Sequence, residues 1–178
     1  RLVLLVAVDQ MRYDYLPRFA DAFTGGFRQL TRAGAVFTNA HLDHYPSVTA
    51  VGHSAMLTGA RPSVSGIVGN DWYDRDLKRS VTSVEDPGTR LVGAGNAAGS
   101  SPHRLRVSTV GDELKMAHPG SRVISLSHKD RSAILMGGRM ADLARGAQRR
   151  RRRRLVEALA HLPGAPHLLG LALDVAAR

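Results

Sequence analysis

The stretch Leu2-Val3-Leu4-Leu5-Val6-Ala7-Val8-Asp9 decides the fold. Seven apolar residues without polar alternation are typical of a strand that is buried on both faces of a parallel sheet. The acid that ends this run is expected at the carboxyl edge of the sheet, which is where open α/β sheets bind their ligands. The sequence therefore predicts that the carboxylate of Asp9 belongs to a binding site.

Forty residues further on, a hydroxyl is predicted at the start of a helix. Thr49 lies in Pro46-Ser47-Val48-Thr49-Ala50-Val51-Gly52-His53. The free N–H groups and the dipole of a helix N-terminus favour an anion. A carboxylate and an alcohol that converge there suit a metal-activated nucleophile. Taken singly, each residue has a simpler interpretation: Asp9 as the partner of a nearby arginine and Thr49 as an ordinary N-cap.

The rest of the chain alternates between strand and helix patterns, with no internal repeat. This order predicts an α/β fold with a mainly parallel, doubly wound sheet. We expect strands at 35–40 and 123–126, a hairpin with arms at 66–73 and 81–84, and helices at 13–19, 26–33, 49–57 and 108–116. We also expect a long surface loop at 87–103, a helix at 155–162, and either a strand or a helix at 168–173.

Composition limits the chemistry that is open to the chain. Its 178 residues are 43% hydrophobic, enough for one domain with a real core, and no apolar stretch reaches the roughly 18 residues that span a bilayer. The absence of cysteine excludes disulfides, thiolate zinc sites and cysteine nucleophiles. A metal ion here must therefore use Asp, Glu, His or hydroxyl ligands.

Four segments together resemble the alkaline phosphatase superfamily, in its threonine-nucleophile branch, the type I phosphodiesterase / nucleotide pyrophosphatase-like family. They are Val8–Tyr15, Pro46–His53, Gly69–Tyr73 and Ser127–Leu135, and the resemblance covers about residues 2–142. One departure is Ser65, which stands before Gly66-Ile67 where the branch commonly has a histidine. No role that follows depends on that position.

The resemblance implies a role for each of five residues. Asp9 resembles a ligand of one of two zinc ions, and Thr49 resembles the nucleophile that becomes phosphorylated while bound to the same ion. Asn70 resembles a hydrogen-bond donor to a phosphoryl oxygen. Lys129 and Arg131 resemble the pair that contacts the phosphate and its transition state. By the same resemblance His53 is not a metal ligand, so we expect it to pack or to lie on the helix surface.

The sequence changes character after Ala141-Asp142-Leu143. We therefore expect residues 1–143 to be the N-terminal part of an alkaline phosphatase-like catalytic domain, and residues 144–178 to be an atypical tail. Six consecutive arginines, Arg149–Arg154, account for much of the net charge of +10. A frameshifted reading explains such an abrupt change better than a genuine or disordered basic tail does. Asp174 ends an apolar run and could imitate a further ligand, but no histidine follows it at the family's interval.

The function implied for the intact enzyme is zinc-dependent hydrolysis of phosphate monoesters through a phosphothreonine intermediate. This chain is expected to be an N-terminal fragment that is inactive alone, because the family's later Asp and His ligands are missing. The alternatives are a phosphodiesterase or nucleotide pyrophosphatase, and a non-enzymatic basic fragment that binds nucleic acid through the arginine tract. The expected partner is a phosphate-ester small molecule, not a specific nucleic acid. The resemblance also implies a periplasmic or secreted location, although the chain shows no signal peptide.

Overall fold

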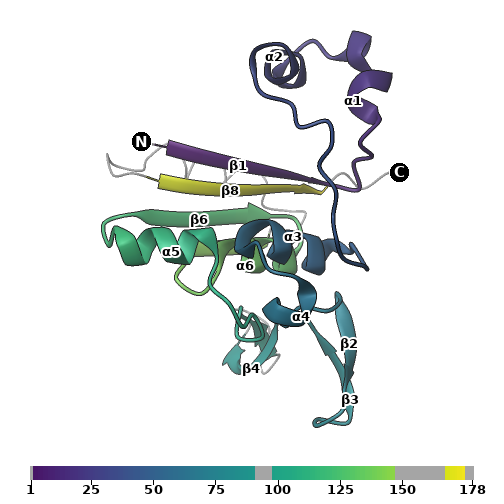
Figure 1. Cartoon of the computed structure of the whole chain (residues 1–178). Helices are drawn as coiled ribbons and strands as arrows, with labels where there is room; N and C mark the ends of the chain where they lie inside the picture. Colours follow the sequence, from purple (N-terminus) through teal and green to yellow (C-terminus); the bar gives the residue numbers. More distant parts are fainter. Residues whose placement is uncertain (1, 91–97, 147–166, 175–178) are drawn as a thin grey trace.

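Four parallel strands form the main sheet of the computed structural model, which describes residues 2–90, 98–146 and, for the backbone alone, 167–174. Their order across the sheet is β1-β8-β6-β7 (Figure 1). The bounds are β1 (Leu2–Asp9), β6 (Arg122–Ser127), β7 (Leu143–Gly146) and β8 (His167–Asp174). All three pairings are parallel, so the strands reach the same edge with their carboxyl ends. The predicted α/β class and mainly parallel sheet are confirmed for the described residues, and residues 168–173 are a strand. The expected burial of β1 on both faces is wrong: it is the outermost strand of the described sheet, and Leu2, Val3, Leu4 and Val6 are 45–63% exposed.

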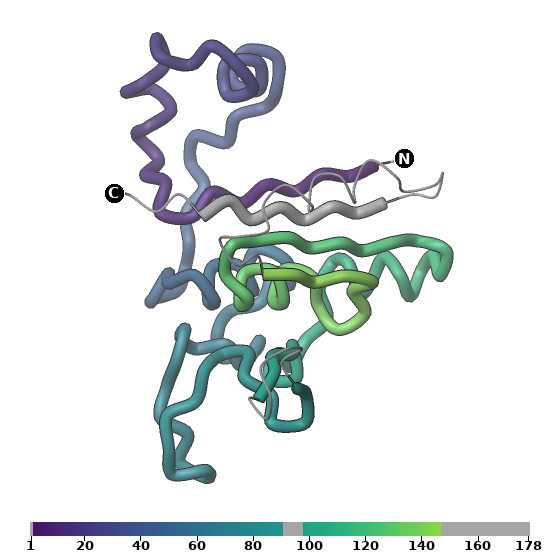
Figure 2. The backbone as a smooth tube through the Cα atoms, turned by 180° about the vertical axis from the view of Figure 1, so that it is seen from behind, coloured from purple at the N-terminus to yellow at the C-terminus, as the bar shows by residue number. Residues whose placement is uncertain are grey.

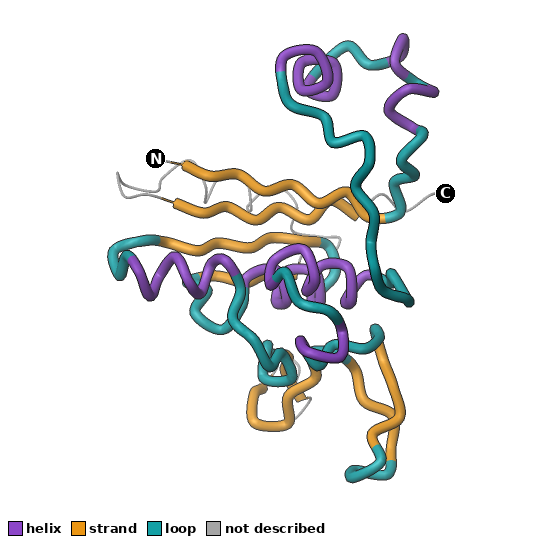
Figure 3. Tube along the Cα trace, in the orientation of Figure 1, coloured by secondary structure: helices purple, strands orange, loops and turns teal. Residues whose placement is uncertain are grey.

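Helices α3 (Thr49–Thr58) and α6 (Asp130–Gly137) form the layer that positions the site. Helix α6 packs against β6, β7 and β8, and α3 packs on α6 (Figure 3). Burial of each large aliphatic side chain here contributes about 1.5–3 kcal/mol. Two buried clusters hold these elements together: Ala50, Ile67, Val84, Leu105, Ile134 and Leu135 form one, and Ala7, Leu57 and Met136 form the other.

Helix α5 (Val110–Ala117) agrees with the helix predicted at 108–116, and it begins at a capping box. The Thr109 hydroxyl accepts from the Asp112 amide at 3.1 Å, and the Asp112 carboxylate accepts from the Thr109 amide at 2.8 Å. The same carboxylate also accepts from the Met140 amide at 2.7 Å. A Cβ at Gly138, which has φ of +77°, would lie 2.5 Å from Asp112 Oδ2. Glycine is therefore required at this position, both for its backbone angle and for space.

The predicted hairpin is present, whereas the predicted loop after it is wrong. Strands β2 (Asp71–Asp74) and β3 (Arg79–Thr82) pair antiparallel, close to the short helix α4 (Pro62–Ser65). Within the segment expected as a loop at 87–103, β4 (Glu85–Arg90) and β5 (Ala98–Ser100) also pair antiparallel. Backbone groups alone make such a ladder, so a sequence rich in Gly, Ser and Pro can form one without a hydrophobic pattern.

Residues 10–48 leave the sheet as an excursion that stands apart from it (Figures 1 and 2). The excursion contains α1 (Tyr15–Arg18), the 3₁₀ turn η1 (Ala20–Ala22) and α2 (Gly26–Ala33), which agrees with the predicted helices. The strand predicted at 35–40 is wrong. That segment is irregular and exposed, Phe37 to 86%, and it lies beside no strand of the described residues. An alternating pattern does not make a strand where no partner supplies hydrogen bonds.

Several expectations fall on the connection between β7 and β8. Residues 147–166, which include the arginine tract and the helix expected at 155–162, lie outside the described residues. The doubly wound arrangement and the division of the chain at residue 143 therefore stay predictions. In the described part of the chain, no helix is long and apolar enough to cross a bilayer.

The carboxylate of Asp142 ties α5 to β6, and this contact predicts a dependence of stability on pH. Its oxygens accept from Lys115 Nζ at 2.8 Å and from the Val123 amide at 2.7 Å. Partial burial opposes ionisation, but these two hydrogen bonds outweigh it and hold the pKa of Asp142 below the usual 3.8. A carboxyl whose pKa is lowered by folding adds stability above its unfolded pKa, and this stability is lost as the pH falls through the folded pKa.

We therefore expect Asp142→Asn to lower the free energy of unfolding at pH 7 by about 0.5–1 kcal/mol, the usual size for a partly exposed charge pair. The difference from the parent should shrink below pH 3.8. Denaturant unfolding at several pH values measures it, with the exposed Asp21→Asn as the control. A deficit that is equal at pH 7 and pH 3 would contradict this assignment.

Candidate active site

Asp9 and Thr49 meet at the carboxyl edge of the sheet, although 40 residues separate them in sequence. Thr49 Oγ1 donates to Asp9 Oδ2 at 2.8 Å. Asp9 ends β1, and Thr49 is the first residue of α3, as the sequence predicts. Thr49 is only 8% exposed because α3 packs against α6. The hydroxyl is thus held in one orientation at a helix N-terminus, where an anion is favoured.

Lys129 brings a positive charge to the same two oxygens from the carboxyl end of β6, two strands away from β1 in the sheet. Its Nζ lies 3.3 Å from Asp9 Oδ2 and 3.5 Å from Thr49 Oγ1. The lysine is the N-cap residue of α6, directly after β6. The parallel pairing of β8 with both β1 and β6 places these two strands' carboxyl ends at one edge. The cation offsets the charge of the carboxylate that accepts from the Thr49 hydroxyl.

Asn70 reaches the site from the loop before β2. Its Oδ1 accepts from the Ala50 amide at 2.9 Å, in the first turn of α3. The N-cap residue of α3, Val48, has no side chain that can cap, so Asn70 supplies the missing acceptor from 20 residues away. Because Oδ1 is engaged, the NH₂ group of Asn70 is the part of the side chain that can donate to a ligand. Sequence reasoning missed this capping role.

His53 is buried beneath the first turn of α3 and exposed to only 3%. Its Nδ1 lies 2.7 Å from the Thr49 carbonyl oxygen, one helical turn earlier. This contact fixes the imidazole against the first turn of α3, so the expected packing role fits its position. Among the described residues, no group hydrogen-bonds to His53 Nε2.

Arg131 lies in the first turn of α6, two residues after Lys129. Its Nε is buried, and within the described ranges it meets no hydrogen-bond acceptor. A buried guanidinium donor without an acceptor is costly unless a ligand or a further protein group satisfies it. The structure thus brings Asp9, Thr49 and Lys129 into direct contact and joins Asn70 to them through Ala50. Among the described residues, no hydrogen bond or ion pair joins the Arg131 side chain to these four residues.

Asp9 and Thr49 fit part of a zinc site. Their oxygens are 2.8 Å apart, a separation that one ion can bridge with bonds of about 2 Å to each. Across the described residues, however, no three His, Cys, Asp or Glu gather as metal ligands. The backbone of β8 places Asp174 in register with Asp9, but its side chain lies outside what the structure describes. The described residues therefore do not complete a tetrahedral site.

The comparisons with known proteins agree with this geometry. Residues 3–134 match the family model described as type I phosphodiesterase / nucleotide pyrophosphatase. The chain is 46% identical over 145 residues to the alkaline phosphatase PhoV of Synechococcus elongatus, covering 80% of this chain and 26% of PhoV. It is 43% identical over 142 residues to the alkaline phosphatase PafA of Elizabethkingia meningoseptica, covering 78% of this chain and 26% of PafA. The chain thus spans about a quarter of the length of these curated relatives.

Solved structures of PafA resemble the fold. The wild-type crystal structure superposes with a TM-score of 0.79 at 40% identity, covering 83% of this chain and 29% of that one. A second structure is a PafA variant with substitutions at a threonine, an asparagine, a lysine and an arginine, and it has a TM-score of 0.75. In that variant the asparagine comes 21 positions after the threonine, and the arginine comes two positions after the lysine. The same separations hold here for Thr49 and Asn70 and for Lys129 and Arg131.

The capping role of Asn70 can be tested by its effect on stability. Asn70→Ala should lower the free energy of unfolding by about 0.5–2 kcal/mol, because α3 loses its N-terminal acceptor. Asn70→Asp should keep the parent stability, because a carboxylate accepts from the same amide and suits the helix dipole. Denaturant unfolding of both variants measures this, with the exposed Asn39→Ala as the control. Equal losses in the Asp and Ala variants would show that Oδ1 does not cap the helix.

Proposed function

The chain belongs to the type I phosphodiesterase / nucleotide pyrophosphatase family, and we propose that the protein of which it forms part hydrolyses phosphate monoesters with Thr49 as the nucleophile. The observation that carries this proposal is the hydroxyl of Thr49, held by Asp9 at 2.8 Å at the start of α3. The similarity to alkaline phosphatases supports a phosphoric ester hydrolase. In this proposal Thr49 Oγ1 attacks phosphorus, the alcohol leaves, and water then hydrolyses the phosphothreonine.

The other site residues have complementary parts in the proposed reaction. Asn70 donates from its NH₂ group to a phosphoryl oxygen, since its Oδ1 is bound to the Ala50 amide. Lys129 acts as a point charge beside Thr49, and Arg131 offers a fork of donors that can hold two oxygens. The Nε of Arg131 is buried and has no acceptor in the described residues, which supports the role of Arg131 as a donor to the phosphoryl group. Together these donors favour a dianionic group with three equatorial oxygens.

Zinc is the cofactor in this proposal, and Asp9 and Thr49 are two of the ligands of one ion. A bound zinc ion would favour the ionised hydroxyl and neutralise the attacking oxygen. The remaining ligands and the second ion belong to the part of the protein outside the described residues. A periplasmic or secreted location is likewise a proposal that rests on the family.

A second candidate is cleavage of phosphate diesters, because the matching family model describes phosphodiesterases and nucleotide pyrophosphatases. A diester offers one fewer anionic oxygen than a monoester. The pair Lys129 and Arg131 therefore favours the monoester on electrostatic grounds. Comparison of kcat/KM for an aryl phosphate and a bis-aryl phosphate distinguishes the two candidates, and faster cleavage of the diester would overturn the role given to this pair.

In the longer protein, Thr49→Ala should abolish turnover and the covalent phosphoenzyme. Mass spectrometry of acid-quenched enzyme detects the added phosphoryl group on the peptide that contains Thr49. Arg131→Ala should lower kcat/KM by roughly 10- to 100-fold, since a charge-assisted hydrogen bond contributes about 1.5–3 kcal/mol. Arg28→Ala, on the exposed α2, is the matched control and should leave kcat/KM unchanged. A phosphoryl group that persists in the Thr49→Ala protein would disprove the nucleophile.

The 178-residue chain alone should show no phosphatase turnover when it is supplied with zinc. Two ligands from the described residues bind zinc weakly and leave the departing oxygen without a metal. The assay compares hydrolysis of an aryl phosphate by the chain and by its Thr49→Ala variant. Turnover that depends on Thr49 would show that the chain carries a complete site.

A further inference from the structure

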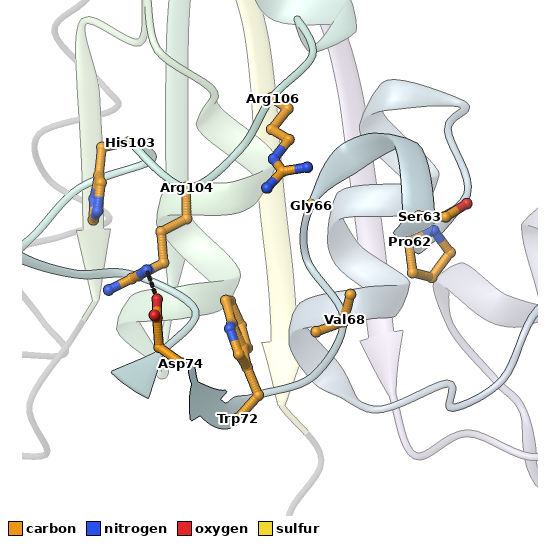
Figure 4. A pocket seen from close by; sticks show the side chains of 9 residues that line it. All are labelled: Pro62, Ser63, Gly66, Val68, Trp72, Asp74, His103, Arg104 and Arg106. Carbon is orange, nitrogen blue, oxygen red and sulfur yellow. Dashed lines mark ion pairs between the residues drawn. The ribbon is translucent and has the colours of Figure 1, made fainter. Parts of the chain in front are cut away.

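A cavity of about 380 Å³ lies away from the main sheet, between α4, strand β2 and the segment before α5. Its volume is within the range of small-molecule sites. It is lined by Pro62, Ser63, Gly66, Val68, Trp72, Asp74, His103, Arg104 and Arg106 (Figure 4). Nothing in the proposed phosphoryl transfer at Thr49 uses these side chains. A ligand in this cavity would therefore be distinct from the phosphoryl group at Thr49.

Trp72 provides a fixed aromatic wall. The guanidinium of Arg104 lies 5.7 Å from the centre of the Trp72 ring, and it is held in turn by Asp74 and Glu85, each at 3.6 Å. A hydrogen bond from the Leu77 amide holds the pKa of Asp74 below its usual value, and the charge of Arg104 acts in the same direction. The negative charge of Asp74 therefore balances the positive charge of Arg104. Figure 4 shows Trp72 between Arg104 and Val68. The Arg104 cation thus lies over one face of the indole, and Val68 contributes an apolar side chain to the same cavity.

Arg106 provides a positive charge that no carboxylate of the described residues neutralises by an ion pair. Its Cγ and Cδ would lie 3.0 Å from a Cβ at Gly66, which has φ of +80°. The glycine therefore lets the arginine stem lie flat against the backbone, and Figure 4 shows the guanidinium directed toward the cavity. The main chain is fixed as well, because the Arg106 amide donates to the Ser65 carbonyl at 2.9 Å. The guanidinium belongs to an exposed side chain that forms no ion pair within the described residues, so an anion can reach it.

We propose that this cavity binds a planar aromatic group that carries an anionic substituent, with the ring against Trp72 and Val68 and the anion at Arg106. The rigid indole and the apolar side chains match a flat ring. The guanidinium matches a carboxylate or phosphate, which it can hold with two parallel hydrogen bonds. Arg104 packs over the indole, and its terminal nitrogens form ion pairs with Asp74 and Glu85, so Arg106 is the cavity arginine without an ion pair among the described residues. This site is independent of hydrolysis at Thr49.

Trp72 is the single tryptophan of the chain, so its fluorescence reports on this cavity alone. The probe is benzoate, added to the 178-residue protein, with neutral benzamide and acetate as partial ligands. We expect a saturable change with benzoate, and binding of benzamide and acetate that is weaker by at least about 10-fold, or about 1.4 kcal/mol. The Thr49→Ala protein should respond as the parent does, so failure of the phosphatase proposal leaves this result unaffected.

Arg106→Gln keeps most of the stem and removes the charge, and it should weaken benzoate binding by at least about 10-fold. Arg75→Gln, at an exposed arginine outside the cavity, is the matched control and should bind as the parent does. Equal unfolding midpoints for both variants exclude a folding defect. The proposal is overturned if benzamide or acetate binds as well as benzoate, or if both variants lose binding equally. It is also overturned if benzoate gives no saturable change up to the order of 10 mM, the weak limit for so small a ligand.

Discussion

The carboxylate of Asp9 is the point to which distant parts of this chain are joined. One of its oxygens accepts from Thr49, 40 residues away, and from Lys129, 120 residues away. A partly buried carboxylate is costly unless hydrogen bonds and an opposite charge compensate it, and these two partners supply both. The cluster can form only if β1 ends where α3 and α6 begin. That requirement is met by parallel strands whose carboxyl ends share an edge.

The strand order of the sheet places part of the segment after residue 143 in its interior. Strand β8 lies between β1 and β6, so it sets the spacing of the two strands that deliver Asp9 and Lys129. Part of the segment after residue 143, which differs so strongly in composition, thereby contributes backbone to the same sheet. Parallel pairing depends mainly on backbone hydrogen bonds and an apolar run. A segment such as His167–Asp174 can meet these demands without matching the family's sequence.

The hairpin β2–β3 links Thr49, the proposed nucleophile, to the proposed cavity for an aromatic anion. Asn70, just before β2, caps α3 next to Thr49, while Trp72 within β2 lines the cavity. Two residues along a strand span only about 6–7 Å, so one short segment serves both places. Arg104 stabilises this segment by bridging Asp74 and Glu85. The hairpin is therefore held on one side by a helix cap and on the other by an ion-pair network.

The sequence by itself determined those elements that depend on a pattern of neighbouring residues. The apolar run that ends at Asp9, the capping box at Thr109 and Asp112, and the start of α3 at Thr49 follow from patterns within a few residues. The residue types expected at the site could also be named from motifs, although their chemical roles stay predictions. The strand expected at 35–40 failed because alternation does not provide a pairing partner, and β4 and β5 were missed because a backbone ladder needs no hydrophobic pattern.

Only the tertiary structure decided that Lys129 reaches Asp9, that Asn70 caps α3 and that Trp72 and Arg106 share a cavity. Each of these contacts joins segments 20 or more residues apart, and their geometry depends on strand order and packing, which no short window of sequence contains.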